Sequence, residues 1–221
     1  MSFFRFFRRP QKTEPITRPK IVPVPTPPVL EERIRPELRQ PSSDAGLDIR
    51  RYFHNQQHFQ CYTSWFGHWG GWISAGHCLT EAQDHLPDFA SGQFIKWPDG
   101  LDAALVDCNL PEIRPTDPVI GQNVIMKGFP AGSRTMESRT GRVYHQRMPG
   151  QYIAHIFEPD EPVVTGMSGG PVLDAKTGQP IGIIITRNSP ADLNNDRDPD
   201  ESADFVALSS VWDAVKAAGT S

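Results

Sequence analysis

Ser168 lies in a glycine-rich run, TGMSGGPV at residues 165–172, which ends in an apolar segment. A serine hydroxyl becomes a useful nucleophile only beside a base that takes its proton, and acyl transfer also needs donors for the developing oxyanion. Gly166 has no Cβ, so the backbone can turn its N–H and that of Ser168 toward one point. The run therefore predicts a nucleophile with an oxyanion hole at Gly166 and Ser168, although a glycine-rich turn without catalytic function would have the same composition.

Two candidate partners for Ser168 precede it in the chain. His77 follows the apolar run WISAG at residues 72–76, and Asp102 comes just before the apolar run AALV at residues 103–106. A catalytic triad needs a nucleophile, a base and a carboxylate that orients the base, and the chain order His, Asp, Ser is one of its known arrangements. The pattern predicts a triad of His77, Asp102 and Ser168, with Asp99 and Asp107 as rival carboxylates.

Three segments resemble the signature blocks of one enzyme family. SAGHC at 74–78, DAAL at 102–105 and GMSGGP at 166–171 are similar, in this order, to those of the chymotrypsin-like (trypsin-fold) serine endopeptidases. The blocks GQNVIMKGFP at 121–130 and MESRTGRV at 136–143 resemble the bacterial glutamyl endopeptidase and HtrA-type branch. The match extends from about residue 60 to residue 212, and it implies the catalytic roles named above.

Many short apolar runs broken by Gly, Pro and Asp predict an all-β fold, a barrel or a sandwich, in residues 45–221. The resemblance implies two six-stranded antiparallel β-barrels, about 45–115 and 116–208, with the active site between them. A C-terminal helix is predicted at 209–219, because Ser210 and Asp213 have capping-box spacing and Gly219 can end it.

Residues 1–44 differ in composition from the rest of the chain. They hold nine of the 22 prolines, with nine Lys or Arg against five Asp or Glu, whereas the remaining residues hold 13 against 21. Such a segment favours extended backbone, so it is predicted to be a basic Pro-rich arm. The acidic remainder argues against a nucleic-acid partner.

The first nine residues, MSFFRFFRR, interrupt their phenylalanines with arginines. They contain no apolar core of a secretory signal, and the chain has no run of membrane-spanning length, which suggests cytoplasmic synthesis or incorporation into a larger assembly. The arm could contact a membrane surface or a protein partner, or be a disordered terminus.

Three cysteines are present, Cys61, Cys78 and Cys108. Cys61 and Cys78 are placed like the disulfide beside the catalytic histidine of chymotrypsin-like enzymes, so we expect them to be close together, and their bonding depends on the compartment. Cys108 is expected to be a buried strand residue. Neither the cysteines nor the histidines show metal-ligand spacing, so no metal or cofactor is expected.

The segment 181–187, IGIIITR, resembles the strand that binds the substrate backbone in this family, which would make Ile185 and Arg187 substrate-binding residues. Glutamyl endopeptidases carry a histidine where this chain has Ile184, so glutamate specificity is not carried over. Asp204 is expected near the base of the primary pocket, which favours cleavage after Arg or Lys, helped by the acidic run 192–201. Alternatively, Arg187 could pair with Asp204 and favour small residues.

The sequence thus predicts a serine endopeptidase that hydrolyses peptide bonds of polypeptide substrates through an acyl-enzyme. Met167 stands where digestive-type enzymes carry an aspartate that pairs with a newly cut N-terminus, so no such zymogen switch is expected. The alternative is a virion or surface-assembly protein that uses the fold as a scaffold and is inactive or only processes itself.

Overall fold

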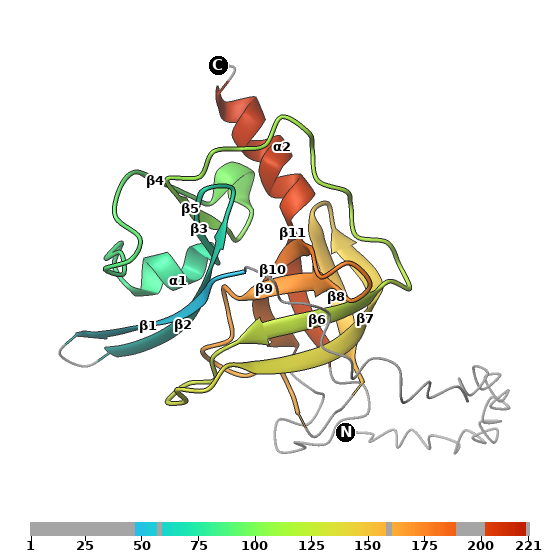
Figure 1. Ribbon diagram of the computed structural model, residues 1–221, viewed down its shortest axis with the longest axis horizontal. Coiled ribbons are helices and arrows are strands. Elements are labelled where there is room, and N and C mark those ends of the chain that lie inside the picture. Colours follow the sequence, from blue (N-terminus) through green and yellow to red (C-terminus); the bar gives the residue numbers. More distant parts are fainter. Residues whose placement is uncertain (1–46, 57–58, 158–160, 189–201, 220–221) are drawn as a thin grey trace, which may run out of the picture. The chain divides into compact units, whose positions relative to one another are not determined.

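The computed structural model describes residues 47–56, 59–157, 161–188 and 202–219, which all belong to one unit of the chain, Pro36–Ser221 (Figure 1). The side chains of residues 56, 59, 187 and 188 are not among the parts described. The predicted arm at 1–44 and the acidic run at 192–201 also lie outside the described residues. Within the described ranges, no helix is long and apolar enough to span a membrane.

An open antiparallel sheet makes up the N-terminal half. Its strands, in order across the sheet, are β1 (Ile49–Gln56), β2 (Phe59–His68), β3 (Gly71–Ser74), β5 (Ala104–Val106) and β4 (Phe94–Lys96). A short helix α1 (Gly76–Glu81) follows β3, and a 3₁₀ turn η2 (Pro98–Gly100) follows β4. Figure 1 shows the β1–β2 ribbon extending beyond the three shorter strands, since β3 pairs only with the last residues of β2.

A closed barrel makes up the C-terminal half. It contains β6 (Asn123–Gly128), β7 (Glu137–Met148), β8 (Gln151–Ile156), β9 (Pro171–Asp174), β10 (Pro180–Asn188) and β11 (Ser202–Ala207), arranged in the order β10-β11-β8-β7-β6-β9. The barrel closes because β9 pairs with both β6 and β10. Helix α2 (Leu208–Gly219) follows β11 without an intervening loop.

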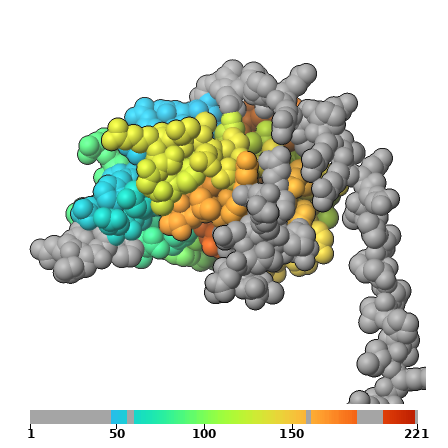
Figure 2. Space-filling model, turned by 90° about the horizontal axis from the view of Figure 1, so that it is seen from below, coloured from blue at the N-terminus to red at the C-terminus, as the bar shows by residue number. Residues whose placement is uncertain are grey.

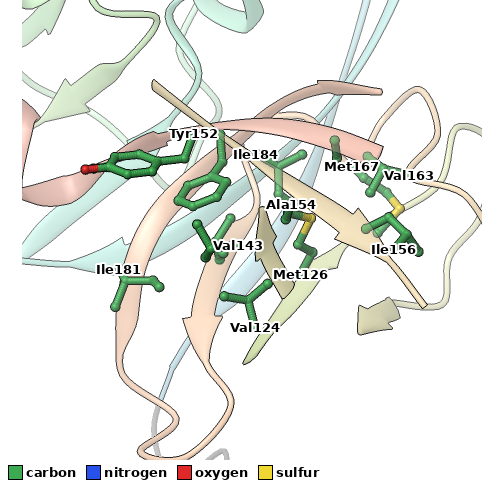
Figure 3. Packing of buried hydrophobic residues seen from close by; sticks show 14 residues of the cluster. Val124, Met126, Val143, Tyr152, Ala154, Ile156, Val163, Met167, Ile181 and Ile184 are labelled. Carbon is green, nitrogen blue, oxygen red and sulfur yellow. The ribbon is translucent and has the colours of Figure 1, made fainter. Parts of the chain in front are cut away.

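The barrel core follows from the alternation of side chains along each strand. On β8, Tyr152, Ala154 and Ile156 are buried, whereas the residues between them are half-buried. These side chains meet Val124 and Met126 of β6 inside the barrel (Figure 3). Burial of each large apolar side chain stabilises the fold by about 1.5–3 kcal/mol.

A second cluster joins the two halves. Phe66, Ile73 and Leu105 of the sheet pack with Ile183 and Val206 of the barrel, and with Val211 of α2. The sheet and the barrel therefore share a buried apolar interface, and the segments that leave it on either side are held at fixed positions.

The predicted all-β class, a six-stranded barrel and the C-terminal helix are confirmed. The other predicted six-stranded barrel is not: over the described residues the N-terminal half is an open sheet, because β1 pairs only with β2 and the three-residue β4 pairs only with β5. The helix begins at Leu208, so Ser210 lies inside it instead of capping it.

Candidate active site

Two consecutive tight turns shape the segment around Ser168. The Met167 N–H donates to Val164 O at 3.1 Å, and the Gly170 N–H donates to Met167 O at 3.0 Å. The third residue of each turn is a glycine with positive φ, Gly166 at 95° and Gly169 at 83°. This is the geometry of a type II turn, which requires glycine at its third position. The glycine pattern of the sequence is thus explained by two turns, and Ser168 is the second residue of the second one.

The peptide between Thr165 and Gly166 has a fixed orientation. The Ala131 N–H donates to Thr165 O at 2.7 Å, and this peptide is trans, so the Gly166 N–H points away from Ala131. Among the described residues, neither the Gly166 nor the Ser168 N–H has an acceptor. Both residues line a cavity of about 520 Å³. The turn therefore leaves two backbone donors available beside Ser168.

Ser64 of β2 ties this turn to the N-terminal sheet. Its fully buried hydroxyl donates to Gly166 O at 2.7 Å and accepts from the Phe129 N–H at 2.9 Å. The Ser64 N–H donates to Ser168 O at 2.9 Å. Ser64 is not among the residues predicted from the sequence, because it follows another hydroxyl residue, Thr63, in a strand of mixed polarity that carries no motif.

His77 and Asp102 are brought together where the sheet strands end. His77 lies in the first turn of α1, directly after β3, and Asp102 lies just before β5, the neighbour of β3. The Asp102 carboxylate accepts from the His77 N–H at 2.8 Å and from Nδ1 at 2.7 Å. These two contacts fix the ring orientation and leave the proton on Nδ1, so that Nε2 of the neutral ring is the acceptor.

The environment of His77 has opposing effects on its charge. Burial lowers the pKa of His77, but the hydrogen bonds with Asp102 and Cys78 outweigh burial and raise it above its ordinary value. Nε2 lies 3.5 Å from Cys78 Sγ. The carboxylate thus stabilises the protonated ring that would form if His77 took a proton.

His77, Asp102 and Ser168 all line the same cavity. The Ser168 hydroxyl donates to Ile185 O at 2.7 Å, and it is this contact, not one with His77, that the structure shows. The three predicted triad residues are therefore neighbours around one cavity, with the carboxylate–histidine pair formed and the serine turned toward β10.

Of the three predicted specificity residues, Ile185 lines the cavity, Asp204 does not, and Arg187 is described only in its backbone. Ile185 and Thr186 line the cavity with Val163 and Val164, so its wall on this side is mainly apolar. The backbone of Arg187 pairs with that of Ala203 on β11. The side chain of Arg187, and with it the predicted pairing with Asp204, lies outside the described residues.

The placement of Asp204 at the base of the pocket needs correction. Its neighbours Ala203 and Phe205 pack in the barrel core, so Asp204 projects from the opposite face of β11 and does not line the cavity. Its Oδ2 atom is 2.9 Å from Gln151 Nε2 and 3.1 Å from Arg147 Nη1. The carboxylate therefore already has a cationic partner within the chain.

The cysteines lie near the site. Cys61 Sγ is 3.9 Å from Cys78 O, so the two residues are close as expected, but both thiols are free. Cys108 is also free, and burial raises the pKa of both Cys61 and Cys108 to about 12. Across the described ranges, no three His, Cys, Asp or Glu side chains gather as a metal site.

We expect three reactive thiols per chain when the protein is denatured without reductant and titrated with a thiol reagent, because all three cysteines are free. In the folded protein Cys61 and Cys108 should react slowly, since the thiolate is the reactive form and their pKa is raised. A single reactive thiol after denaturation would instead show that Cys61 and Cys78 are bonded.

No protein-family model matches the chain, and no curated protein matches it either. Solved structures do match. The active form of the Rv3671c protease from M. tuberculosis superposes with a TM-score of 0.55 and 18% identity, over 93% of each chain. HL collagenase superposes with a TM-score of 0.53 and 15% identity, over 80% of this chain and 92% of the collagenase chain.

The serine endoprotease from Yersinia pestis gives a TM-score of 0.52 and 12% identity over 77% of this chain, which spans 61% of the Yersinia chain. The chain has the trypsin-like serine protease fold. Within this fold, the His77–Asp102 pair comes from the sheet and Ser168 from the segment between β8 and β9 of the barrel. The trypsin-like fold alone does not establish activity, which depends on the geometry described above.

Proposed function

We propose that this protein is a serine endopeptidase, with Ser168 as nucleophile, His77 as general base and acid, and Asp102 as the group that orients His77. The observation that carries the proposal is the pair of hydrogen bonds from His77 to Asp102, at a cavity that also contains Ser168 and two available backbone donors. These are the components that hydrolysis by a triad needs.

In the proposed reaction, Ser168 Oγ attacks the substrate carbonyl carbon and its proton passes to His77 Nε2. The carbonyl oxygen becomes an oxyanion, which accepts hydrogen bonds from the Gly166 and Ser168 N–H groups. The C–N bond then breaks, and the leaving amine takes the proton from Nε2. Water, activated by the same nitrogen, hydrolyses the resulting ester and restores Ser168.

Attack requires the Ser168 hydroxyl to leave Ile185 O and turn toward His77. This is a rotation about one side-chain bond, and such contacts often tighten only when substrate binds. The oxyanion donors need no comparable change, because Thr165 O is already held by Ala131 and Met167 is buried in the barrel core. We therefore propose that the chain needs no cleavage to become active.

We also propose that the side chain before the cleaved bond is uncharged and packs against Val163, Val164 and Ile185. Asp204 does not line the cavity, and the carboxylates that do, Glu81 and Asp102, lie with His77 on the part of the cavity formed by the sheet half. The N-terminal sheet would be the counterpart of the second barrel in the trypsin-like fold, with the site between the two halves. We propose, too, that the Pro-rich arm at 1–44 is a separate segment that contacts a protein partner or a membrane surface.

A fluorophosphonate probe tests the function directly. We expect one covalent adduct per chain, located at Ser168 by peptide mass spectrometry, because the probe reacts with activated serines. Ser168→Ala should not be labelled, whereas Ser210→Ala, a matched change on α2, should be labelled like the wild type. Absence of an adduct on protein that circular dichroism shows to be folded would favour the inactive scaffold.

A further inference from the structure

A second cavity of about 520 Å³ lies beside the candidate active site. It is formed by the β1–β2 ribbon, the segment 87–89 and the turn 132–134. Tyr62 of β2 lines both this cavity and the one that contains Ser168. Figure 2 shows blue residues of β1 bordering yellow residues of the C-terminal half, in agreement with the contact between Arg51 and Ser133. The two cavities are therefore adjacent along the surface.

Two arginines line the second cavity, Arg51 and Arg134. Arg51 Nη1 donates to Ser133 O at 3.1 Å, which holds the guanidinium in place and leaves other N–H donors. Among the described residues, neither arginine has a carboxylate within 4.0 Å. Asp88 is the acidic residue in the described lining, so positive charge is in excess.

The rest of the wall is aromatic. Phe53 and Tyr62 stack with their ring centroids 4.5 Å apart on one face of β1, and Tyr52 and Phe89, which pack in a cluster on the other face, also line the cavity. Both arginines are exposed, and a guanidinium binds a carboxylate well because it offers paired donors. The chemistry of the cavity fits a ligand that brings one carboxylate and an aliphatic stem.

We propose that this second cavity binds an acidic side chain of the polypeptide substrate and makes its sequence a determinant of cleavage; this rests on the proposed function. β10 borders Ser168 through Ile185 and Thr186, and Tyr62 borders it from β2. An extended substrate that crosses from β10 past Ser168 to Tyr62 reaches Arg51 and Arg134 within a few residues of the cleaved bond.

The test compares peptide pairs that differ by Glu or Gln at one position, scanned over four positions on each side of the cleaved bond. At one position, on the side that passes Tyr62, we expect kcat/KM to be about five-fold higher for Glu than for Gln, the upper end of the range for an exposed ion pair, since both arginines are exposed. The preference should shrink as salt rises from about 50 to about 500 mM.

Arg51→Gln and Arg134→Gln should each reduce this preference, and the double variant should abolish it. Arg142→Gln is the control, because Arg142 lies on β7 and lines neither cavity. Equal rates for Glu and Gln peptides at every position, or a preference that survives in the double variant, would overturn the proposal.

Binding to Ser168→Ala separates this inference from the proposed function. Fluorescence anisotropy of the same labelled peptides should show tighter binding of the Glu peptide, and the double arginine variant should lose the difference. If peptides bind in this way but are not cleaved by the wild type, the protease proposal fails and the acidic site stands. If peptides are cleaved without any Glu preference in rate or binding, the acidic site fails alone.

Discussion

Asp102→Asn is expected to lower kcat/KM by about 10⁴-fold while the fold is retained. Asp102 accepts from both the backbone N–H and Nδ1 of His77, at 2.8 and 2.7 Å. An asparagine amide can present a donor to Nδ1, which would move the ring proton to Nε2 and remove the acceptor that Ser168 needs. Steady-state kinetics on the peptide that the wild type cleaves best would measure the loss.

The pH profile provides a second readout of the same substitution. Because the raised pKa of His77 depends on Asp102, wild-type activity should rise with pH through a midpoint above the ordinary histidine value of about 6.5, as the ring loses its proton. In Asp102→Asn the interaction with the carboxylate is lost, burial still lowers the pKa of His77 and only Cys78 raises it, so the midpoint should move to lower pH. NMR titration of the His77 ring would measure this change in pKa directly.

Asp107→Asn is the control for Asp102. Asp107 is exposed and accepts from the Gln93 N–H at 3.0 Å, at the far end of β5 from His77. We expect near-normal kcat/KM. Retained activity in Asp102→Asn together with a large loss in Asp107→Asn would show that the triad has been assigned to the wrong carboxylate.

Gly166→Ala is expected to lower kcat/KM by two to three orders of magnitude, on the order of the loss of one oxyanion donor. Gly166 has φ 95°, and a Cβ there would lie 2.5 Å from Phe129 O and 2.7 Å from Ala131 N. Relief of that clash requires the turn to move, and the Thr165–Gly166 peptide would no longer hold its N–H toward the cavity. The loss should fall mainly on kcat, because the donor acts on the transition state.

Gly121→Ala separates loss of the donor from backbone strain. Gly121 has φ 89°, close to that of Gly166, but nothing lies within 4 Å of a Cβ built on it. The control should lose about 1 kcal/mol of stability in urea unfolding and keep its activity. Gly166→Ala protein with wild-type kcat would show that catalysis does not depend on the orientation that this turn gives the Gly166 N–H.

The sequence predicted the His77, Asp102 and Ser168 neighbourhood because each residue lies in a short local pattern: a strand end, a strand start or a pair of glycine turns. Ser64 gave no comparable signal. Its strand also contains Gln60 and Thr63, and nothing in that pattern distinguishes Ser64, whose hydroxyl donates to Gly166 O, from a serine that is only buried. Its role depends on a partner 102 residues away, which no local pattern reports.

Asp204 shows the limit of placing a side chain by resemblance alone. Ala203 and Phe205 on either side of it pack in the barrel core, so regular alternation along β11 directs Asp204 toward Arg147. The irregularity in this pair of strands lies on β10, where Ile185 is the extra residue between Ile184 and Thr186, and both Ile185 and Thr186 line the cavity. The openness of the N-terminal sheet was likewise not predictable, because strand closure depends on pairing between distant segments.

The hydrogen bonds of Ser64 would make the proposed activity depend on assembly of both halves. Ser168 belongs to the barrel, but the carbonyls of Gly166 and Ser168 are held by a serine of the sheet. During synthesis, Ser64 and His77 leave the ribosome long before Ser168, and the turn can take its final form only after the two halves dock. Under the proposed function, a partly made chain would therefore have no competent site and could not hydrolyse neighbouring polypeptides.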